Sequence, residues 1–553
     1  MKYRILGCLL LLGIGSPPMT ARRVVGAQHA ALLHMTVTSL RDTSSPSALS
    51  PRDSALHALN RLAYGPRPGE VDRVAAEGVM HWIDRQLTPG RIDDGALARR
   101  ERDFRILDYD RGDLAGMYAE VQRERRERKL AANGAADTVV TPRDQTARRL
   151  AGQFQELAVV RAALSERQLY EVMVDFWTNH FNVYFGKGAD RFLTPDYIER
   201  TIRPHALGQF QDLLLATAKS PAMLFYLDNW QSVAPGAEPP GLARMARSDD
   251  ARREQMLARM PQGLNENYAR ELMELHTLGV DGGYTQQDVI AVARIFTGWS
   301  IERPQQGGAF RFNDWAHDYG EKMVRGVRFP AGHGMDEGVR LLKLLAQDPA
   351  TIHHVSRQLC ARFVSDEPPD GCVDAAVAAW SRTEGDIAEV LRAIFRSPEF
   401  WSGRAVRAKV KTPLEFMVSA VRATGGDPDT TPRLAQVIGR LGEPLYAQPS
   451  PAGYPESQED WVNSGALLLR MNMAVALAAG RLPGVTLALD SLVPATDDAN
   501  ALIETVDVRL LGGILTTHSG DVLRREVAEV RDPVAARALV IGLALGGPEF
   551  QRQ

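Results

Sequence analysis

The sequence has little net charge and only one long hydrophobic run, which lies at its N-terminus. After Ile14 no stretch approaches the roughly 18 apolar residues that a membrane-spanning helix needs, so we predict no span in the rest of the chain. A formal net charge of −3 excludes an overall basic nucleic-acid binder, and we expect no nucleic-acid partner. With 44% hydrophobic and 24% charged residues, the composition is that of a folded globular protein.

Standard catalytic and ligand-binding motifs are also missing. The sequence contains no GxSxG, no HExxH, no phosphate-binding Walker loop, no GxGxxG after a strand and no EF-hand loop. It has no CxxC pair and no Cys/His spacing of the zinc-binding kind. These absences weigh against the nucleotide-binding, zinc-protease and serine-hydrolase classes.

The N-terminus has the pattern of a secretory signal peptide. Lys2 and Arg4 precede an apolar run over Ile5–Ile14, and Gly, Ser, Pro and small residues follow this run. We therefore predict that residues 1–27 are a signal peptide. The mature chain is expected to be exported, to the periplasm or outside the cell, with no membrane span left after the signal is removed.

Cysteine is scarce, with three residues in the chain. Cys8 suggests a lipoprotein, but almost no apolar segment precedes it, which argues against that interpretation. Export leaves Cys360 and Cys372, an even pair. In an oxidising compartment they are expected to form a disulfide or to remain as two small buried thiols, and the sequence leaves both alternatives open.

The hydrophobic pattern predicts a mainly α-helical fold, a multi-helical globular array with one short β-hairpin. Leu56, Leu59 and Leu62 recur at a spacing of three, which is typical of a buried helix face. Short runs of strand-like residues occur only around Phe310–Phe312 and Met323–Phe329. There is no alternation of strands and helices and no internal repeat.

Composition divides the chain into four segments. The segments are a signal peptide over 1–27, a flexible lead-in rich in Ser, Thr and Pro over 28–52, a small helical hairpin with a charged helix and linker over 53–143, and a large α-helical domain over 144–553. Within the last segment, residues near 232–262 carry Pro, Gly and dense charge. This stretch predicts a mobile insertion.

The helix predicted over 265–278 is the strongest candidate for chemistry. At about 100° per residue, Asn267, Glu271 and Glu274 fall within about a 60° sector beside the apolar stripe. At the edge of that stripe, desolvation is expected to raise the pKa of Glu271 into the range of a general acid or base. Two carboxylates on one face could alternatively hold a divalent cation, or Glu274 could pair with Arg270.

A second cluster lies on the helix predicted over 166–185. Asp175, Asn179 and Asn182 share one face of this helix, while His180 falls on an aromatic face. A histidine on an aromatic face is more often a core residue than a ligand. The neighbouring Asn179 and the density of aromatic residues keep His180 as a candidate for the site.

The third cluster lies in RFNDWAHDYGEK, residues 311–322. Because neighbouring residues on a strand face opposite ways, we expect His317 and Asp318 to serve different partners rather than each other. The expected partners are the polar face of helix 265–278 and the helix that carries His180. The alternative is a turn in which Asp318 caps Gly320 and Lys322 forms a surface ion pair.

Eight motifs occur in an order that resembles a known bacterial family. In chain order they are ALNRLAYGPRPGEV, DFWTNHFNV, NENYARELMELHTLGVDGGYTQQDV, FTGW, HDYGEK, RFVSDEPP, KVKTPLEF and AGYPESQEDWVNSGALLLRMN. Over roughly residues 53–552 the chain resembles the exported bacterial proteins called domain of unknown function 1800. The resemblance implies no activity and no catalytic residues. Genes of that family often lie beside those of an exported alkaline-phosphatase-like family, so the resemblance implies such a protein as a partner. The insertion near 232–262 departs from the family's usual form.

Three functions remain open on this basis. The favoured one is an exported, hydrolase-like enzyme that acts on an envelope or extracellular polymer, with Glu271 as the acid/base, Asn267 and Glu274 as orienting groups, and the other candidates in the same pocket. The alternatives are a non-catalytic envelope assembly or binding protein and a divalent-metal-binding protein that uses the same polar cluster. Polar groups on buried faces cost stability unless they are paired or used, which motivates all three. The candidate site residues are Glu271, Glu274, Asn267, His180, His317 and Asp318.

Overall fold

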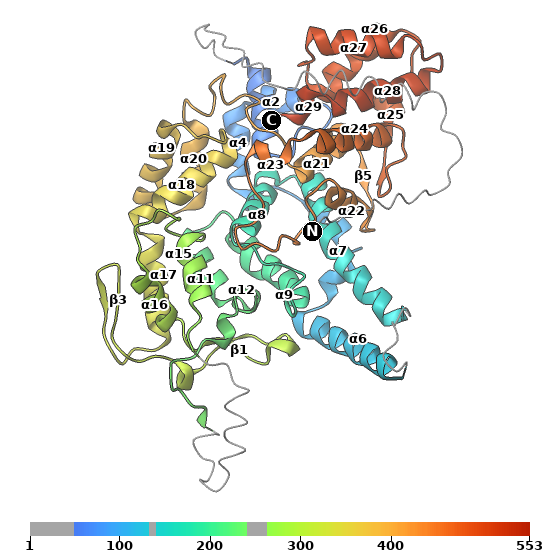
Figure 1. Cartoon of the computed structure of the whole chain (residues 1–553). Coiled ribbons are helices and arrows are strands. Elements are labelled where there is room, and N and C mark those ends of the chain that lie inside the picture. Colours follow the sequence, from blue (N-terminus) through green and yellow to red (C-terminus); the bar gives the residue numbers. More distant parts are fainter. Residues whose placement is uncertain (1–48, 132–139, 241–262) are drawn as a thin grey trace, which may run out of the picture. The chain divides into compact units, whose positions relative to one another are not determined.

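The fold is that of a computed structural model, which describes residues 49–131, 140–240 and 263–553 (Figure 1). The predicted signal peptide, most of the predicted lead-in and most of the charged insertion lie outside the described residues. Within the described ranges, none of the helices combines the length and the apolar character needed to cross a membrane.

Helices make up most of the regular structure, as the sequence predicts, and the strands are short. In the described residues they form three two-stranded antiparallel sheets rather than one hairpin. The two strand-like runs predicted as one hairpin do not pair with each other: the second run folds on itself as β3 (Lys322–Val324) and β4 (Val327–Phe329). The strand-like run β2 (Phe310–Phe312) pairs instead with β1 (Trp299–Ile301), which the sequence did not single out as a strand.

The described chain forms two compact units. The main unit contains the described residues up to Val462, together with Leu482–Leu492 and Gln551–Gln553, and the C-terminal unit contains Asn463–Arg481 and Val493–Phe550. The α-helices and remaining strands of the main unit are α2 (Pro51–Leu62), α3 (Glu70–Glu77), α4 (Val79–Gln86), α5 (Gly95–Glu101), α6 (Arg111–Ala131), α7 (Pro142–Leu164), α8 (Gln168–His180), α9 (Asp190–Tyr197), α10 (Arg203–His205), α11 (Phe210–Lys219), α12 (Pro221–Tyr226), α15 (Glu266–Glu274), α16 (Gln286–Ile295), α17 (Met335–Ala346), α18 (Pro349–Phe363), α19 (Asp370–Thr383), α20 (Ile387–Arg396), α21 (Pro413–Ala423), β5 (Asp427–Pro428), α22 (Arg433–Arg440), α23 (Gln458–Trp461), β6 (Val485–Thr486) and α25 (Leu489–Leu492). Those of the C-terminal unit are α24 (Ser464–Ala478), α26 (Ala499–Val506), α27 (Thr517–Val527), α28 (Pro533–Gly546) and all but the last residue of α29 (Pro548–Gln551).

In the C-terminal unit, two glycines allow α24 and α28 to pack closely. A Cβ atom at Gly542 would lie 2.8 Å from the Cα atom of Val475, and one at Gly546 would lie 3.2 Å from the Cα atom of Met471. Asp532 caps the start of α28 by accepting hydrogen bonds from two backbone N–H groups of its first turn. Small residues at the contact therefore determine how closely these helices approach.

In the main unit, α8 lies among buried aromatic side chains. Trp177 is fully buried, and its indole N–H donates to the carbonyl oxygen of Ala206 (3.0 Å). The helix begins at Gln168 without a side-chain cap, so the capping-box spacing of Ser165 and Gln168 is not used. The Ser165 hydroxyl donates instead to the Asp94 carboxylate (2.6 Å).

The predicted caps of the next two site helices are present. The Asn265 side chain accepts a hydrogen bond from the Tyr268 N–H (3.1 Å) and starts α15. Thr285 and Asp288 form a reciprocal capping box at the start of α16. The first of these helices ends at Glu274, one turn before the end predicted from the hydrophobic pattern.

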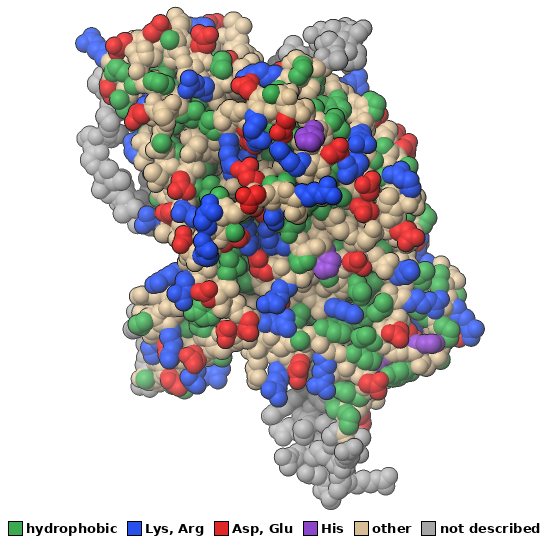
Figure 2. All heavy atoms as spheres, turned by 180° about the vertical axis from the view of Figure 1, so that it is seen from behind, with side chains coloured by type: hydrophobic (Ala, Val, Ile, Leu, Met, Phe, Trp, Pro, Cys, Tyr) green, Lys and Arg blue, Asp and Glu red, His purple; other side chains and the backbone are tan. Residues whose placement is uncertain are grey.

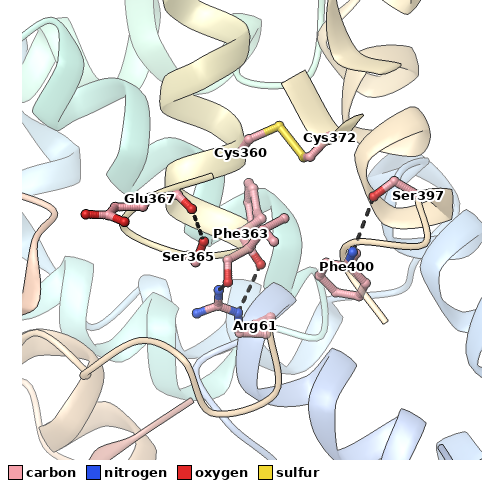
Figure 3. The surroundings of a disulfide bond; sticks show 9 residues. Arg61, Cys360, Phe363, Ser365, Glu367, Cys372, Ser397 and Phe400 are labelled. Atoms are coloured by element: carbon pink, nitrogen blue, oxygen red, sulfur yellow. Dashed lines mark hydrogen bonds between the residues drawn. A yellow bond between two sulfur atoms is a disulfide. The ribbon is translucent and has the colours of Figure 1, made fainter. Parts of the chain in front are cut away.

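Cys360 and Cys372 form a disulfide that links α18 to α19 across 12 positions of the sequence (Figure 3). Both residues are fully buried, so the sequence alternative of two free thiols does not apply. Beside the disulfide, the Arg61 side chain of α2 donates from Nε to the carbonyl oxygen of Phe363 (3.0 Å). The end of α18 is thus tied both to the next helix and to the first described one.

Basic and acidic side chains are interspersed on the molecular face that Figure 2 shows. Exposed ion pairs such as Arg328 and Glu321 (2.6 Å) occur on the molecular surface. Exposed pairs of this kind contribute little to stability because water screens them. The charged groups that strongly affect stability lie in the interior.

Candidate functional site

A cavity of about 80 Å³ lies beside α8 in the main unit. Asp175, Asn179 and Asn182 all line it. The sequence predicted that these three residues share one helix face; Asp175 and Asn179 do lie on α8, whereas Asn182 lies two residues beyond the end of the helix and still lines the same cavity. The polar face of α8 is therefore one wall of a cavity rather than a surface exposed to bulk water.

The segment 443–461 supplies much of the opposite wall, and α8 holds it by side-chain hydrogen bonds. Asn179 donates from Nδ2 to the carbonyl oxygen of Tyr454 (2.8 Å) and accepts from the Tyr454 N–H (2.6 Å). Asn182 donates to two further carbonyl oxygens of the same segment. Gly453, with a φ of 73°, must be glycine here because a Cβ atom would lie 2.4 Å from the Asn179 carbonyl oxygen.

Asp175 is the polar group of α8 that is not used to hold the fold. Among the described residues, none donates a hydrogen bond to its carboxylate, and its neighbours act on it through charge alone. Burial raises the pKa of Asp175 to about 7, while the charge of Arg362 lowers it and those of Glu415 and Glu456 raise it. A partly protonated carboxyl group therefore faces the cavity near neutral pH.

Glu443 provides a second carboxyl group in the same cavity. Burial raises the pKa of Glu443 to about 8, and the charge of Asp175 raises it further, against a hydrogen bond from the Leu414 N–H (2.8 Å). The two carboxyl groups are thus coupled, and the pair holds on to a proton at neutral pH. Pairs of carboxyl groups with separated pKa values are a common basis for acid–base catalysis.

A buried network of charged groups stands behind the carboxyl pair. Arg362 bonds to Glu415 through Nη1 and lies 3.7 Å from a carboxylate oxygen of Glu456. Lys409 is buried and donates to Asp366 (2.7 Å). Breaking a buried pair by removing one partner is costly, so this network holds the wall of the cavity in place.

The two other arginines of the cavity wall are also paired with carboxylates. Arg203 forms two hydrogen bonds of 2.8 Å with Glu171. Arg161 donates to Glu101 (2.6 Å) and also bonds to Glu199. Each arginine that lines the cavity therefore has an acidic partner.

Aromatic side chains complete the lining. Tyr64, Tyr446, Tyr454 and Trp461 border the cavity. Tyr446 has a φ of 59° and stacks on Phe154 with 4.3 Å between ring centroids. The rings of Tyr454 and Trp461 lie 6.0 Å apart. Tyr454 is partly exposed, and so its ring remains accessible to a ligand.

The predicted residues of α15 lie on a partly exposed helix face. Burial raises the pKa of Glu271, and the charge of Glu274 raises it further, which is the direction expected from the sequence. Arg270 lies 3.9 Å from Glu266 rather than pairing with Glu274. Asn267 is exposed. The face has the predicted electrostatics, and a catalytic role for it stays a prediction.

His180 is a buried residue of the aromatic core. Its Nε2 lies 3.2 Å from the carbonyl oxygen of His276, and its ring stacks on Phe176 and meets Phe181 edge-on. Burial lowers the pKa of His180 to about 3, and the charges of His276 and His354 lower it further. The imidazole is neutral at physiological pH and packs as a core side chain.

His317 and Asp318 have different partners, as predicted, but they lie between β2 and β3 rather than on a strand. Nδ1 of His317 lies 2.8 Å from the Thr297 carbonyl oxygen, and Nε2 lies 3.1 Å from that of His333. Asp318 accepts from Nε of Arg294 (2.7 Å). The hydrogen bonds found for these two side chains reach neither α15 nor α8, which carry the expected partners.

The turn predicted as the alternative at this stretch is present in part. The Gly320 N–H donates to the Asp318 carboxylate (2.8 Å), as expected for a capped turn. Lys322 is not at the surface; it is buried and donates to Glu337 (2.7 Å). The stretch thus joins a turn to a buried ion pair.

The six predicted residues do not line the cavity beside α8. Within the described part of the chain, no group of three or more His, Cys, Asp or Glu side chains is arranged to hold a metal ion. Four charged residues of the cavity were not among the predicted site residues: Asp175, Glu443, Arg362 and Glu456. Only the helix face that carries Asp175 was identified from the sequence. The three acidic or basic partners come from distant segments, so no spacing in the sequence brings them together.

Comparison with known proteins gives a family but no characterised relative. Neither the curated proteins nor the solved structures yield a match. The model of the family described as "Protein of unknown function (DUF1800)" matches residues 57–552, which confirms the resemblance carried by the ordered motifs. The chain therefore belongs to the DUF1800 family.

Proposed function

We propose that the protein is a hydrolase-like enzyme in which Asp175 and Glu443 act as an acid–base pair on a substrate bound beside α8. One observation carries the proposal: two coupled carboxyl groups face one cavity, and one of them has no hydrogen-bonding partner among the described residues. Perturbed carboxyl groups in a cavity are typical of catalytic sites.

The interaction between the two groups assigns their roles. Burial raises the pKa of both, and the charge of Asp175 raises that of Glu443 further, so Glu443 would keep its proton once Asp175 has lost its own. Glu443 would donate its proton to the leaving group as the scissile bond breaks, and Asp175 would take a proton from the attacking water. The hydroxyl of that water joins one product, and a net proton passes from Glu443 to Asp175. Exchange with solvent then restores the starting state.

Export and a polymeric substrate are part of the same proposal. The signal-like N-terminus and the disulfide between Cys360 and Cys372 both support an oxidising compartment outside the cytoplasm. An enzyme there would meet envelope or extracellular polymers. An exported alkaline-phosphatase-like protein remains the expected partner, and co-purification of the two proteins tests it.

The experiment is a screen of the purified chain against envelope and extracellular polymers, with release of soluble products as the readout. Asp175→Asn and Glu443→Gln should each lower the rate on a responsive polymer by about 100-fold or more. Glu271→Gln should leave it within about twofold of the wild type.

Each alternative gives a different outcome in the same screen. Loss of activity in Glu271→Gln alone would move the site to α15 and refute the proposal. Turnover that survives Asp175→Asn would also refute it. A protein that assembles or binds without catalysis would release no product from any polymer.

A further inference from the structure

We infer that the substrate group received by the cavity beside α8 is a single uncharged sugar residue that stacks on Tyr454. This inference rests on the proposed function of the same cavity and names its class of substrate. Three properties of the described residues carry it: the pairing of the arginines, the aromatic lining and the size of the cavity.

The charges of the wall do not favour an anionic ligand. Arg161, Arg203 and Arg362 all line the cavity, and each already bonds to at least one glutamate. An incoming carboxylate or phosphate would therefore find every guanidinium on the wall already bound to a glutamate, although Nε of Arg362 has no hydrogen-bond partner among the described residues. It would also meet the carboxyl groups of Asp175 and Glu443. Like charges at short range are unfavourable, so a neutral group fits better than an anion.

The aromatic lining provides a surface for a sugar ring. Tyr454 is partly exposed, and its hydroxyl donates to the Pro444 carbonyl oxygen (2.8 Å), which fixes the ring in place. Trp461 lies beside it and is held by its indole N–H, which donates to the carbonyl oxygen of Pro455 (2.9 Å). A rigid aromatic face can pack against the C–H groups of a sugar without ordering a flexible side chain.

The polar groups on the cavity wall suit hydroxyl groups. A sugar hydroxyl both donates and accepts, so it can bond to Asp175 in either protonation state. Two carboxyl groups flanking a sugar are also the usual arrangement for cleavage of a glycosidic bond. The volume of about 80 Å³ exceeds the roughly 10–15 Å³ that one water needs but is small for a length of polymer. A single residue, at a chain end or as a substituent, is the group that we expect to enter.

The test measures binding by isothermal titration calorimetry with the full-length Asp175→Asn protein, which should not turn over its ligand. The probes are glucose, galactose, mannose and N-acetylglucosamine, with glucuronate and galacturonate as anionic counterparts. At least one neutral sugar should bind at concentrations up to about 50 mM, and the uronates should bind about tenfold more weakly. Two variants at one position isolate the ring: Tyr454→Ala should weaken binding about tenfold, and Tyr454→Phe, which keeps the aromatic face but loses the hydrogen bond to Pro444, should weaken it clearly less.

Several results would overturn the inference. These are the absence of binding by every neutral sugar, equal or tighter binding of the uronates, and unchanged affinity in Tyr454→Ala. The failure of this inference can be told apart from that of the proposed function. Sugar binding that depends on Tyr454 without hydrolysis of any glycoside would remove the catalytic proposal alone. Hydrolysis of a non-sugar bond that requires Asp175, without sugar binding, would remove the sugar inference alone.

Discussion

Replacing Asp175 by asparagine should stabilise the protein at alkaline pH while it abolishes activity. Burial raises the pKa of this carboxyl group from 3.8 to about 7, so the folded chain binds the proton more tightly than the unfolded chain does. The contribution of Asp175 to stability is therefore largest below about pH 4 and is lost as the pH rises from there to about 7. Asparagine has the same shape and never ionises, so it escapes this loss.

The size of the effect follows from the two pKa values. At about 1.4 kcal/mol per pKa unit, the change from 3.8 to about 7 corresponds to about 4 kcal/mol once Asp175 is fully ionised. Water in the cavity screens part of the charge, so we expect a gain of about 2–4 kcal/mol in the free energy of unfolding near pH 8.5. Near pH 4 the gain should shrink to about 0.6 kcal/mol or less, because Asp175 is then protonated in the folded wild type and about 40% protonated in the unfolded chain.

Urea unfolding of the wild type and Asp175→Asn, followed by circular dichroism at about pH 4 and about pH 8.5, measures this difference. Asp374→Asn, at an exposed position of α19, is the matched control and should change stability by less than about 0.5 kcal/mol at either pH. A gain of the same size at both pH values, or a loss of stability near pH 8.5, would refute the reasoning. It would mean that ionised Asp175 is well solvated or paired in the folded protein.

Two further predictions concern stability. Burial lowers the pKa values of His57, His180 and His276 to about 3, so the unfolded chain binds more protons below about pH 6.5 and each histidine removes about 1.4 kcal/mol per pH unit as the pH falls. Three buried carboxyl groups act in the opposite direction: Asp175, Glu443 and Glu156, whose pKa burial raises to about 8. The free energy of unfolding should therefore be nearly flat from about pH 5 to 6.5 and fall above about pH 7. Urea titrations at several pH values measure this profile. Cys360→Ser should lower the free energy of unfolding by about 3 kcal/mol in the absence of reductant. The melting temperature of this variant should no longer depend on dithiothreitol, whereas that of the wild type should fall when dithiothreitol is added. A wild type whose melting temperature does not change with dithiothreitol would contradict the disulfide.

Local features of the fold could be predicted from the sequence because their causes are local. Asn265 caps its helix, and Thr285 and Asp288 form a capping box, since these interactions span only three residues. Ser165 has the same spacing but does not cap the helix, which begins at Gln168 with Arg167 before it. The Ser165 hydroxyl accepts from the Arg167 N–H (2.9 Å) and donates to Asp94, which lies 71 positions earlier, and a contact at that range leaves no trace in the local pattern.

Only the wall of the candidate site that α8 contributes could be predicted from the sequence. Helical periodicity places Asp175 and Asn179 on one face of α8, and this face lines the cavity together with Asn182, which follows the end of the helix. Glu443 and Arg362, which complete the cavity wall around Asp175, lie far away in the sequence and reach the cavity through tertiary packing. His180 was selected because histidine often takes part in catalysis, but it lies on the other face of α8. Burial keeps its imidazole neutral there, and Nε2 lies 3.2 Å from a backbone carbonyl oxygen.

The pH dependence of kcat/KM on a responsive polymer tests the assignment of Asp175 and Glu443 most directly. The account predicts a bell-shaped profile that rises as Asp175 loses its proton near pH 7 and falls as Glu443 loses its own near pH 8. Since the charge of Asp175 is one cause of the raised pKa of Glu443, the falling limb should be the more sensitive to salt. A profile that is flat from about pH 6 to 9, or one whose only limb lies near the ordinary carboxyl pKa of about 4, would contradict the assignment.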